Sequence, residues 1–218
     1  MKFPVHIIIL GQEGVGKSAL VVRFLTRRFL TEFAETDEID YERTITLDDR
    51  QVSLRITDVS GKSLQTRAAS RELLMQADAA VVVYSVTDQS SVTAARHALH
   101  CIRKYRPPPL RHRRLQPLPV LLLGNKSDLD HIRTVKRHCE PSDWTSDFTL
   151  TAECSARDDA DGVRVLFHKL IRKVLQTREA GNKGGRKMSH ASLGSPKQLR
   201  STIKRRFSMF SRERISTL

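Results

Sequence analysis

The chain has 218 residues, of which 39% are hydrophobic, and its 38 Lys and Arg against 24 Asp and Glu give a formal net charge of +14. This length suits one domain of ordinary size with an appendage. The apolar runs are too short to cross a bilayer, which excludes a protein built of membrane-spanning helices. The three cysteines show no metal-type or redox-type spacing, so we expect a reducing compartment, with the cytoplasm as the default.

Short apolar strands alternate with helical patterns along the chain. Strands are expected at Val5–Leu10, Arg43–Leu47, Val52–Thr57, Ala79–Val86, Val120–Leu123 and Phe148–Glu153. Helices are expected from Lys17 onward and at Leu64–Met75, Ser90–Tyr105 and Asp159–Gln176. Nearly continuous aliphatic runs are typical of parallel strands covered on both faces, and the second and third strands indicate a hairpin with its turn at 48–51. The pattern predicts an α/β fold, a mostly parallel six-stranded sheet with one antiparallel edge strand and helices on both faces.

The composition changes near position 178. Residues 178–218 hold 11 Lys and Arg against 2 Asp and Glu, among many Gly and Ser. We therefore expect a domain at 1–177 and a disordered basic tail at 178–218. A short amphipathic helix near 197–211 stays open, because apolar residues recur there at helical spacing. Such a tail favours anionic surfaces, and a simply solvated tail is an equally weighted alternative.

The segment Gly11-Gln12-Glu13-Gly14-Val15-Gly16-Lys17-Ser18 matches the P-loop pattern G-x-x-x-x-G-K-[ST]. It follows a predicted strand and precedes a predicted helix, which is the context that the motif requires. The glycines let backbone N–H groups turn toward phosphates, and the helix N-terminus adds a positive end. Lys17 is expected to reach the β- and γ-phosphates, and the Ser18 hydroxyl is expected to bind Mg²⁺.

A second motif, Asn125-Lys126-Ser127-Asp128, follows the Val120–Leu123 strand. The carboxyl end of a strand in an open α/β sheet is where ligands bind. The Asp128 carboxylate can accept two hydrogen bonds from guanine N1–H and its 2-amino group, whereas adenine offers no such pair. Lys126 can lie along the base, and Asn125 can join this loop to the P-loop. Together the two motifs predict a site for a guanine nucleotide.

With these two motifs the chain resembles the Ras superfamily of small GTPases over roughly residues 4–177. The branch it resembles most holds the Ras-related oestrogen-regulated growth inhibitor and the Ras-like proteins near it. The resemblance implies a P-loop NTPase G domain that binds GTP or GDP with Mg²⁺ and acts as a signalling switch. It also implies that Asp58 holds Mg²⁺ through water, that Thr36 binds Mg²⁺ in switch I, and that the Gly61 amide senses the γ-phosphate. Nucleotide contacts are implied for Gly11, Glu13, Gly14, Val15, Gly16, Lys17, Ser18, Ala19, Phe29, Asn125, Lys126, Asp128, Ser155, Ala156 and Arg157.

Two positions depart from the family pattern. Lys62 stands where the family usually has the glutamine that orients the attacking water, and lysine has no acceptor for that water. Glu13 replaces a small P-loop residue and would crowd the arginine of a GTPase-activating protein. We therefore predict intact nucleotide binding with slow hydrolysis. The alternative is a hydrolysis-deficient pseudo-GTPase that acts as a binding module.

The resemblance does not determine where the protein is located or which partners it binds. The chain has no cysteine after Cys154, so we expect no prenylation. We expect a cytoplasmic monomer, and peripheral contact with an anionic membrane or a nuclear location through the basic tail remains open. A nucleic-acid-binding protein is disfavoured, because that reading rests on charge alone. The protein effectors and regulators are not identified by the sequence.

Overall fold

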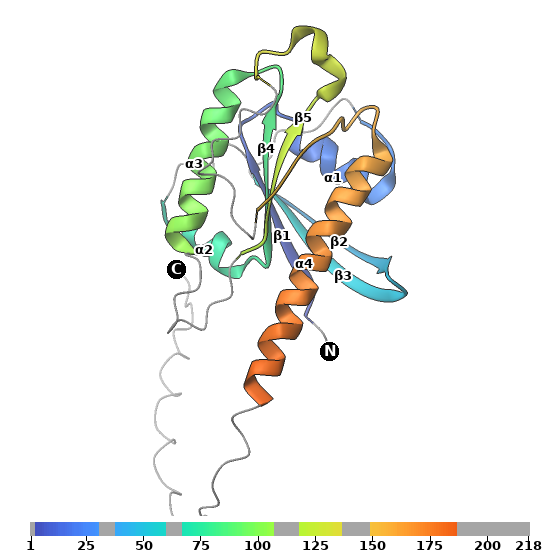
Figure 1. Ribbon diagram of the computed structural model, residues 1–218, viewed down its shortest axis with the longest axis vertical. Coiled ribbons are helices and arrows are strands. Elements are labelled where there is room, and N and C mark those ends of the chain that lie inside the picture. The colour runs from blue at the N-terminus through green and yellow to red at the C-terminus, as the bar shows by residue number, and fades with distance from the viewer. Residues whose placement is uncertain (1–2, 31–37, 60–66, 107–117, 137–148, 187–218) are drawn as a thin grey trace, which may run out of the picture.

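The computed structural model describes residues 3–30, 38–59, 67–106, 118–136 and 149–186 (Figure 1). The strands are β1 (Val5–Gly11), β2 (Glu38–Leu47), β3 (Arg50–Val59), β4 (Ala79–Ser85), β5 (Val120–Asn125) and β6 (Thr149–Glu153). The helices are α1 (Lys17–Thr26), α2 (Arg67–Gln76), α3 (Gln89–Tyr105) and α4 (Ala160–Arg186), with a 3₁₀ helix at Ser127–Ile132. Among the described helices, none combines the length and the apolar character needed to span a membrane.

The six strands form one sheet in the order β2-β3-β1-β4-β5-β6. β2 pairs with β3 in the antiparallel sense, and the other neighbouring pairs are parallel. This confirms the predicted α/β fold with its single antiparallel edge strand. Every residue of β1, β4 and β5 is buried, as continuous aliphatic runs require in strands covered on both faces.

The core has two layers, one on each face of the sheet. Helices α1 and α4 lie on one side of the sheet, and α2 and α3 lie on the other (Figure 1). Ile7 and Ile9 of β1 belong to the first layer, whereas Ile8 belongs to the second, because side chains alternate along a strand. In the first layer the Phe24 ring of α1 stacks on the Phe167 ring of α4 with centroids 4.5 Å apart. This contact fixes α1 against α4 beneath the P-loop.

The β2–β3 hairpin is longer and tighter than the sequence pattern indicated. Asp48 and Asp49 form its turn with φ of 50° and 58°, and Leu47 pairs with Arg50. Two successive positive φ values match the twist of hairpin strands, and Asp tolerates that conformation. Arg50 and Gln51, which the sequence placed in the turn, therefore belong to β3.

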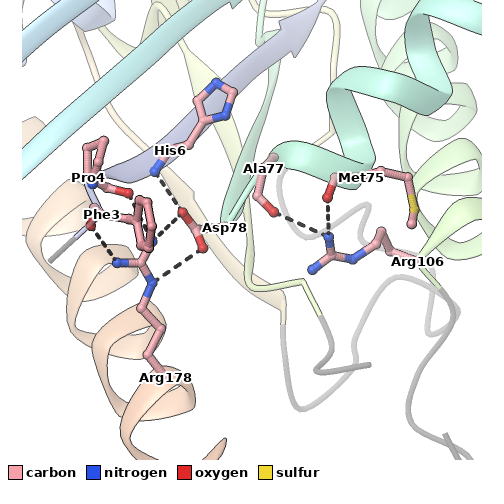
Figure 2. A network of polar contacts seen from close by, with 8 residues as sticks. All are labelled: Phe3, Pro4, His6, Met75, Ala77, Asp78, Arg106 and Arg178. Atoms are coloured by element: carbon pink, nitrogen blue, oxygen red, sulfur yellow. Dashed lines mark hydrogen bonds and ion pairs between the residues drawn. The ribbon is translucent and has the colours of Figure 1, made fainter. Parts of the chain in front are cut away.

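The end of the sheet opposite the P-loop is closed by arginine side chains (Figure 2). Arg178 of α4 donates to Asp78 before β4, at 2.6 Å and 3.3 Å, and to the carbonyl oxygens of Phe3 and Pro4. Asp78 also accepts the His6 backbone N–H at 2.9 Å.

α4 continues to Arg186, whereas the sequence pattern placed the end of this helix at Gln176. The Arg178 side chain holds the first residues beyond Gln176 against the domain. The predicted division between 1–177 and the tail 178–218 stays a prediction.

Candidate nucleotide-binding site

The loop between β1 and α1 has the backbone that a P-loop needs. Gly11, Gly14 and Gly16 have φ of 150°, 76° and 94°, values that side-chain-bearing residues rarely adopt. A Cβ at Gly11 would collide with the Val83 carbonyl, and one at Gly16 would collide with the Asn125 amide. The loop can therefore lie against β4 and β5 only because these positions carry no side chain.

Lys17 begins α1 and lies buried beneath this loop. Its Nζ donates to the Gln12 carbonyl at 3.0 Å. Burial lowers the pKa of Lys17, and the charges of Asp58 and Glu13 partly oppose that shift. The α1 N-terminus has no side-chain cap. A partly desolvated cation beside an uncapped helix N-terminus is an arrangement that favours an anion such as phosphate.

Ser18 and Asp58 bring two oxygen ligands together. The Ser18 hydroxyl donates to Asp58 Oδ2 at 2.5 Å, which joins α1 to the end of β3. Burial raises the pKa of Asp58, while Ser18 and the Lys17 charge oppose the shift. A hydroxyl and a carboxylate fit Mg²⁺, which prefers oxygen ligands and is usually held by few protein groups. No group of three or more His, Cys, Asp or Glu side chains gathers around a common point within the described residues.

Asn125, at the end of β5, joins the two predicted nucleotide loops. Its Nδ2 donates to the Val15 carbonyl of the P-loop at 2.8 Å, and its Oδ1 accepts the Ala156 N–H at 3.0 Å. The side chain is 2% exposed, so these are buried contacts of an amide with both ends occupied. The Ala156 amide would therefore share its proton between Asn125 and any base oxygen.

The base side of the site is built by Asp128 and Ser155. The Ser155 hydroxyl donates to Asp128 Oδ1 at 2.7 Å and accepts the Arg157 and Asp158 N–H groups. Lys126 has φ 67° at the start of the 3₁₀ helix, so the backbone turns sharply between Asn125 and Asp128. One oxygen of Asp128 is thereby held in place while the carboxylate remains partly exposed.

The structure thus brings most of the predicted nucleotide residues to one end of the sheet. Val15 and Ala19 are buried in the core, so any nucleotide contact would be through their backbone, while Glu13 is exposed. Phe29 is 36% exposed beyond the end of α1. Three predicted catalytic or metal-binding residues, Thr36, Gly61 and Lys62, lie outside the described residues. Their roles stay predictions.

Two connections were not anticipated from the sequence. Gln12 exchanges hydrogen bonds with Ser90 at 3.1 Å and 3.2 Å and donates weakly to Asp88 at 3.3 Å. Asp88 is the N-cap of α3 and accepts the Ser90 N–H. An Asp before a helical pattern can be recognised in the sequence as an N-cap. Nothing in the local pattern indicates that the start of α3 contacts the P-loop. The second connection is made by Arg23 of α1 and joins the base side of the site.

Comparison with known proteins agrees with this geometry. The model of the Ras family matches residues 6–176. The Ras-related and estrogen-regulated growth inhibitor-like protein of Bos taurus is 36% identical over 175 residues, which cover 78% of this chain and 83% of that protein. The Ras-related and estrogen-regulated growth inhibitor of Homo sapiens is 34% identical over 186 residues, covering 85% and 88% of the two chains.

The Ras-like protein family member 11A-like of Danio rerio is 33% identical over 211 residues, covering 93% of this chain and 80% of that protein. The similarity spans the P-loop, the Asn125–Asp128 motif and the sheet that holds them. The chain belongs to the Ras family and is therefore a small GTPase.

Proposed function

We propose that this protein is a signalling switch that binds GTP and GDP with Mg²⁺ and hydrolyses GTP slowly. Membership of the Ras family supports guanine-nucleotide binding in general. The observation that carries the proposal for this chain is the Asn125 side chain, which bonds the P-loop at Val15 and the base loop at Ala156. A single buried amide thus couples the phosphate side of the site to the base side.

On the phosphate side, the α1 N-terminus and Lys17 would bind the triphosphate. The Lys17 ammonium now donates to Gln12 in its own loop, so a phosphate oxygen would add a partner to a cation that is already in position. Charge-assisted contacts of this kind are shorter and stronger than those between neutral groups. Ser18 and Asp58, with the predicted Thr36, would hold Mg²⁺, which neutralises phosphate charge when bound.

On the base side, Asp128 would select guanine. The Ser155 hydroxyl fixes one carboxylate oxygen, so the carboxylate is oriented before a ligand arrives. A site built to accept two hydrogen bonds rejects a base that cannot donate them, because its polar groups would be left unpaired. Phe29 would cover one face of the base, as the family resemblance implies.

Slow hydrolysis is supported by Lys62 and Glu13. Lysine is a donor only, so Lys62 cannot accept a hydrogen bond from the attacking water. Glu13 is exposed in the P-loop, where its carboxylate would meet an arginine brought by an activating protein. The chain would then stay loaded with GTP for longer than a protein with the usual glutamine.

The test is single-turnover GTP hydrolysis with Mg²⁺ on the purified full chain, after chromatographic identification of the bound nucleotide. Lys62→Gln should raise the rate by about a hundredfold, the low end of what a group that aids proton transfer contributes. Lys104→Gln removes the same charge from an exposed position of α3 and serves as the matched control.

Three outcomes would change the proposal. A wild-type rate that Lys62→Gln does not raise would contradict the assigned cause of slow hydrolysis. GTP that persists in both proteins would favour the hydrolysis-deficient binding module. A preparation that binds no guanine nucleotide would overturn the proposal as a whole.

A further inference from the structure

Arg23 of α1 makes four contacts with one guanidinium. Its Nε donates to the Ala156 carbonyl at 2.5 Å, and one terminal nitrogen donates to the Arg157 carbonyl. The other terminal nitrogen donates to the Arg27 carbonyl at 2.8 Å. The same group lies over the Phe29 ring, 5.6 Å from its centroid. Two segments, residues 27–29 and 156–157, therefore meet on one planar cation.

These segments are the ones assigned to the base rather than to the phosphates. Ala156 and Arg157 form the loop beside Asp128, and Phe29 is the aromatic residue expected to cover the guanine. Arg23 lies six residues after Lys17, about 9 Å along the helix axis from the phosphate side at 1.5 Å per residue. Its contacts therefore concern how the base is held, and they do not reach the reacting phosphate.

The base loop is held from two sides. Asn125 accepts the Ala156 N–H, and Arg23 donates to the carbonyl of the same residue. Without Arg23 the Ala156–Arg157 backbone would keep the Asn125 contact but lose its connection to α1. α1 itself is fixed by the Phe24–Phe167 stack, so Arg23 links the position of a packed helix to the Ala156–Arg157 loop.

We propose that Arg23 is a positioning residue that holds the Ala156–Arg157 loop and the Phe29 ring together and so slows the release of guanine nucleotide. The inference rests on the proposed nucleotide binding and adds to it the residue that controls residence time. Arginine suits this task, because its planar fork donates to two carbonyls while its face lies on an aromatic ring. Lysine, a single point of charge, cannot do both at once.

The experiment is the dissociation rate of a fluorescent GDP from the full chain with Mg²⁺, measured by chasing with excess GDP. Arg23→Ala should raise this rate by about tenfold, the effect expected when hydrogen bonds from a charged donor are lost at a partly exposed site. The Arg23→Lys variant should also release GDP much faster than the wild type, because lysine restores the charge but not the planar guanidinium that donates to two carbonyls. Single-turnover hydrolysis of preloaded GTP should change by less than about twofold, since Arg23 does not face the phosphates.

Arg172→Ala is the matched control. Arg172 of α4 makes an equally bidentate contact with Asp48, at 2.7 Å and 2.8 Å, but joins α4 to the β2–β3 turn. Its loss should leave GDP dissociation unchanged. A double-mutant cycle of Arg23→Ala with Phe29→Leu should give a combined effect smaller than the product of the two, because they disrupt one contact.

The outcomes separate the inference from the function on which it rests. If the wild type does not bind fluorescent GDP, the nucleotide proposal fails. If it binds and Arg23→Ala releases GDP at the wild-type rate, the role of Arg23 is refuted while nucleotide binding stands. If Arg23→Ala and Arg172→Ala accelerate release equally, the effect is a general loss of stability and the positioning role is also refuted.

Discussion

The two ends of the parallel sheet use similar side chains in different ways. At the carboxyl ends of the strands, Lys17 donates to Gln12 in a loop whose glycines keep the backbone open. At the amino ends, Arg178 donates to Asp78 and to the carbonyls of Phe3 and Pro4 (Figure 2). Cations meet backbone carbonyls at both ends, but within the described residues the uncapped helix N-terminus beside such a cation, that of α1, lies at the carboxyl ends.

Arg106 also contacts backbone carbonyls near the amino ends of the strands. Its terminal nitrogen donates to the carbonyls of Leu74, Met75 and Ala77, at the end of α2 and just beyond it, at 3.2–3.4 Å. Burial lowers the pKa of Arg106, although the Asp78 charge opposes that shift. Helix carbonyls need such partners, and here another helix supplies one. The comparison teaches that the backbone carbonyls at one end of the sheet are bound by arginine side chains of the protein, although the buried Arg106 Nε has no hydrogen-bond partner among the described residues, whereas the other end is arranged to accept a ligand.

The largest expected effect is a loss of GDP affinity in the Asn125→Ala variant. Both ends of a buried amide would be lost, leaving the Val15 carbonyl and the Ala156 N–H unpaired. Two buried hydrogen bonds at about 1.5 kcal/mol each correspond to roughly a hundredfold loss of GDP affinity. Calorimetric titration with GDP and Mg²⁺ measures it, and Gln76→Ala, an exposed amide of α2, is the control. Unchanged affinity would show that the two loops are not coupled through Asn125.

Asp78→Ala should disrupt the opposite end of the sheet, lowering stability without lowering GDP affinity. The variant loses the Arg178 fork and the His6 N–H contact, which should lower the free energy of unfolding by about 2 kcal/mol. GDP affinity should stay within about twofold of the wild type, because the nucleotide loops are untouched. Urea unfolding and GDP titration measure the two quantities. Glu179→Ala, which breaks an exposed ion pair with Arg50, is the control and should cost little. A matched fall in GDP affinity would contradict the independence of the two ends.

The smallest expected effect is a pH dependence from His6. Burial lowers its pKa from 6.5, Arg55 adds to the shift, and Asp40, Asp78 and a backbone hydrogen bond at Gln76 oppose it. The unfolded chain therefore binds a proton more readily than the folded protein does. Stability should be full above the unfolded value and fall as pH drops from 6.5 toward the lower folded pKa.

Urea unfolding at about pH 7.5 and about pH 5.5 tests this sign, since the slope of stability against pH reports the difference in bound protons. His6→Gln, which cannot titrate, should lose less stability between the two pH values than the wild type. An equal loss would assign the pH dependence to other groups, such as Asp40, whose pKa is lowered chiefly by its hydrogen bond from Arg55.

Much of the fold followed from local patterns. The aliphatic runs of β1, β4 and β5 indicated central parallel strands because burial on both faces leaves no room for alternation. The P-loop and the Asn125–Asp128 motif indicated the nucleotide end because their residues lie close together in sequence. The roles of Thr36, Gly61 and Lys62 remain predictions, since they lie outside the described residues.

Contacts between distant positions could not be predicted in this way. Arg178 meets Asp78 across 100 residues, and Arg23 meets Ala156 across 133. An arginine in an amphipathic helix looks the same in sequence whether it faces solvent or a backbone carbonyl. The sequence by itself determined the order of strands and helices and the nucleotide motifs, because short-range spacing and hydrophobic burial encode them. Only the tertiary structure decided which cations close one end of the sheet and which one holds the base loop, because packing alone selects those partners.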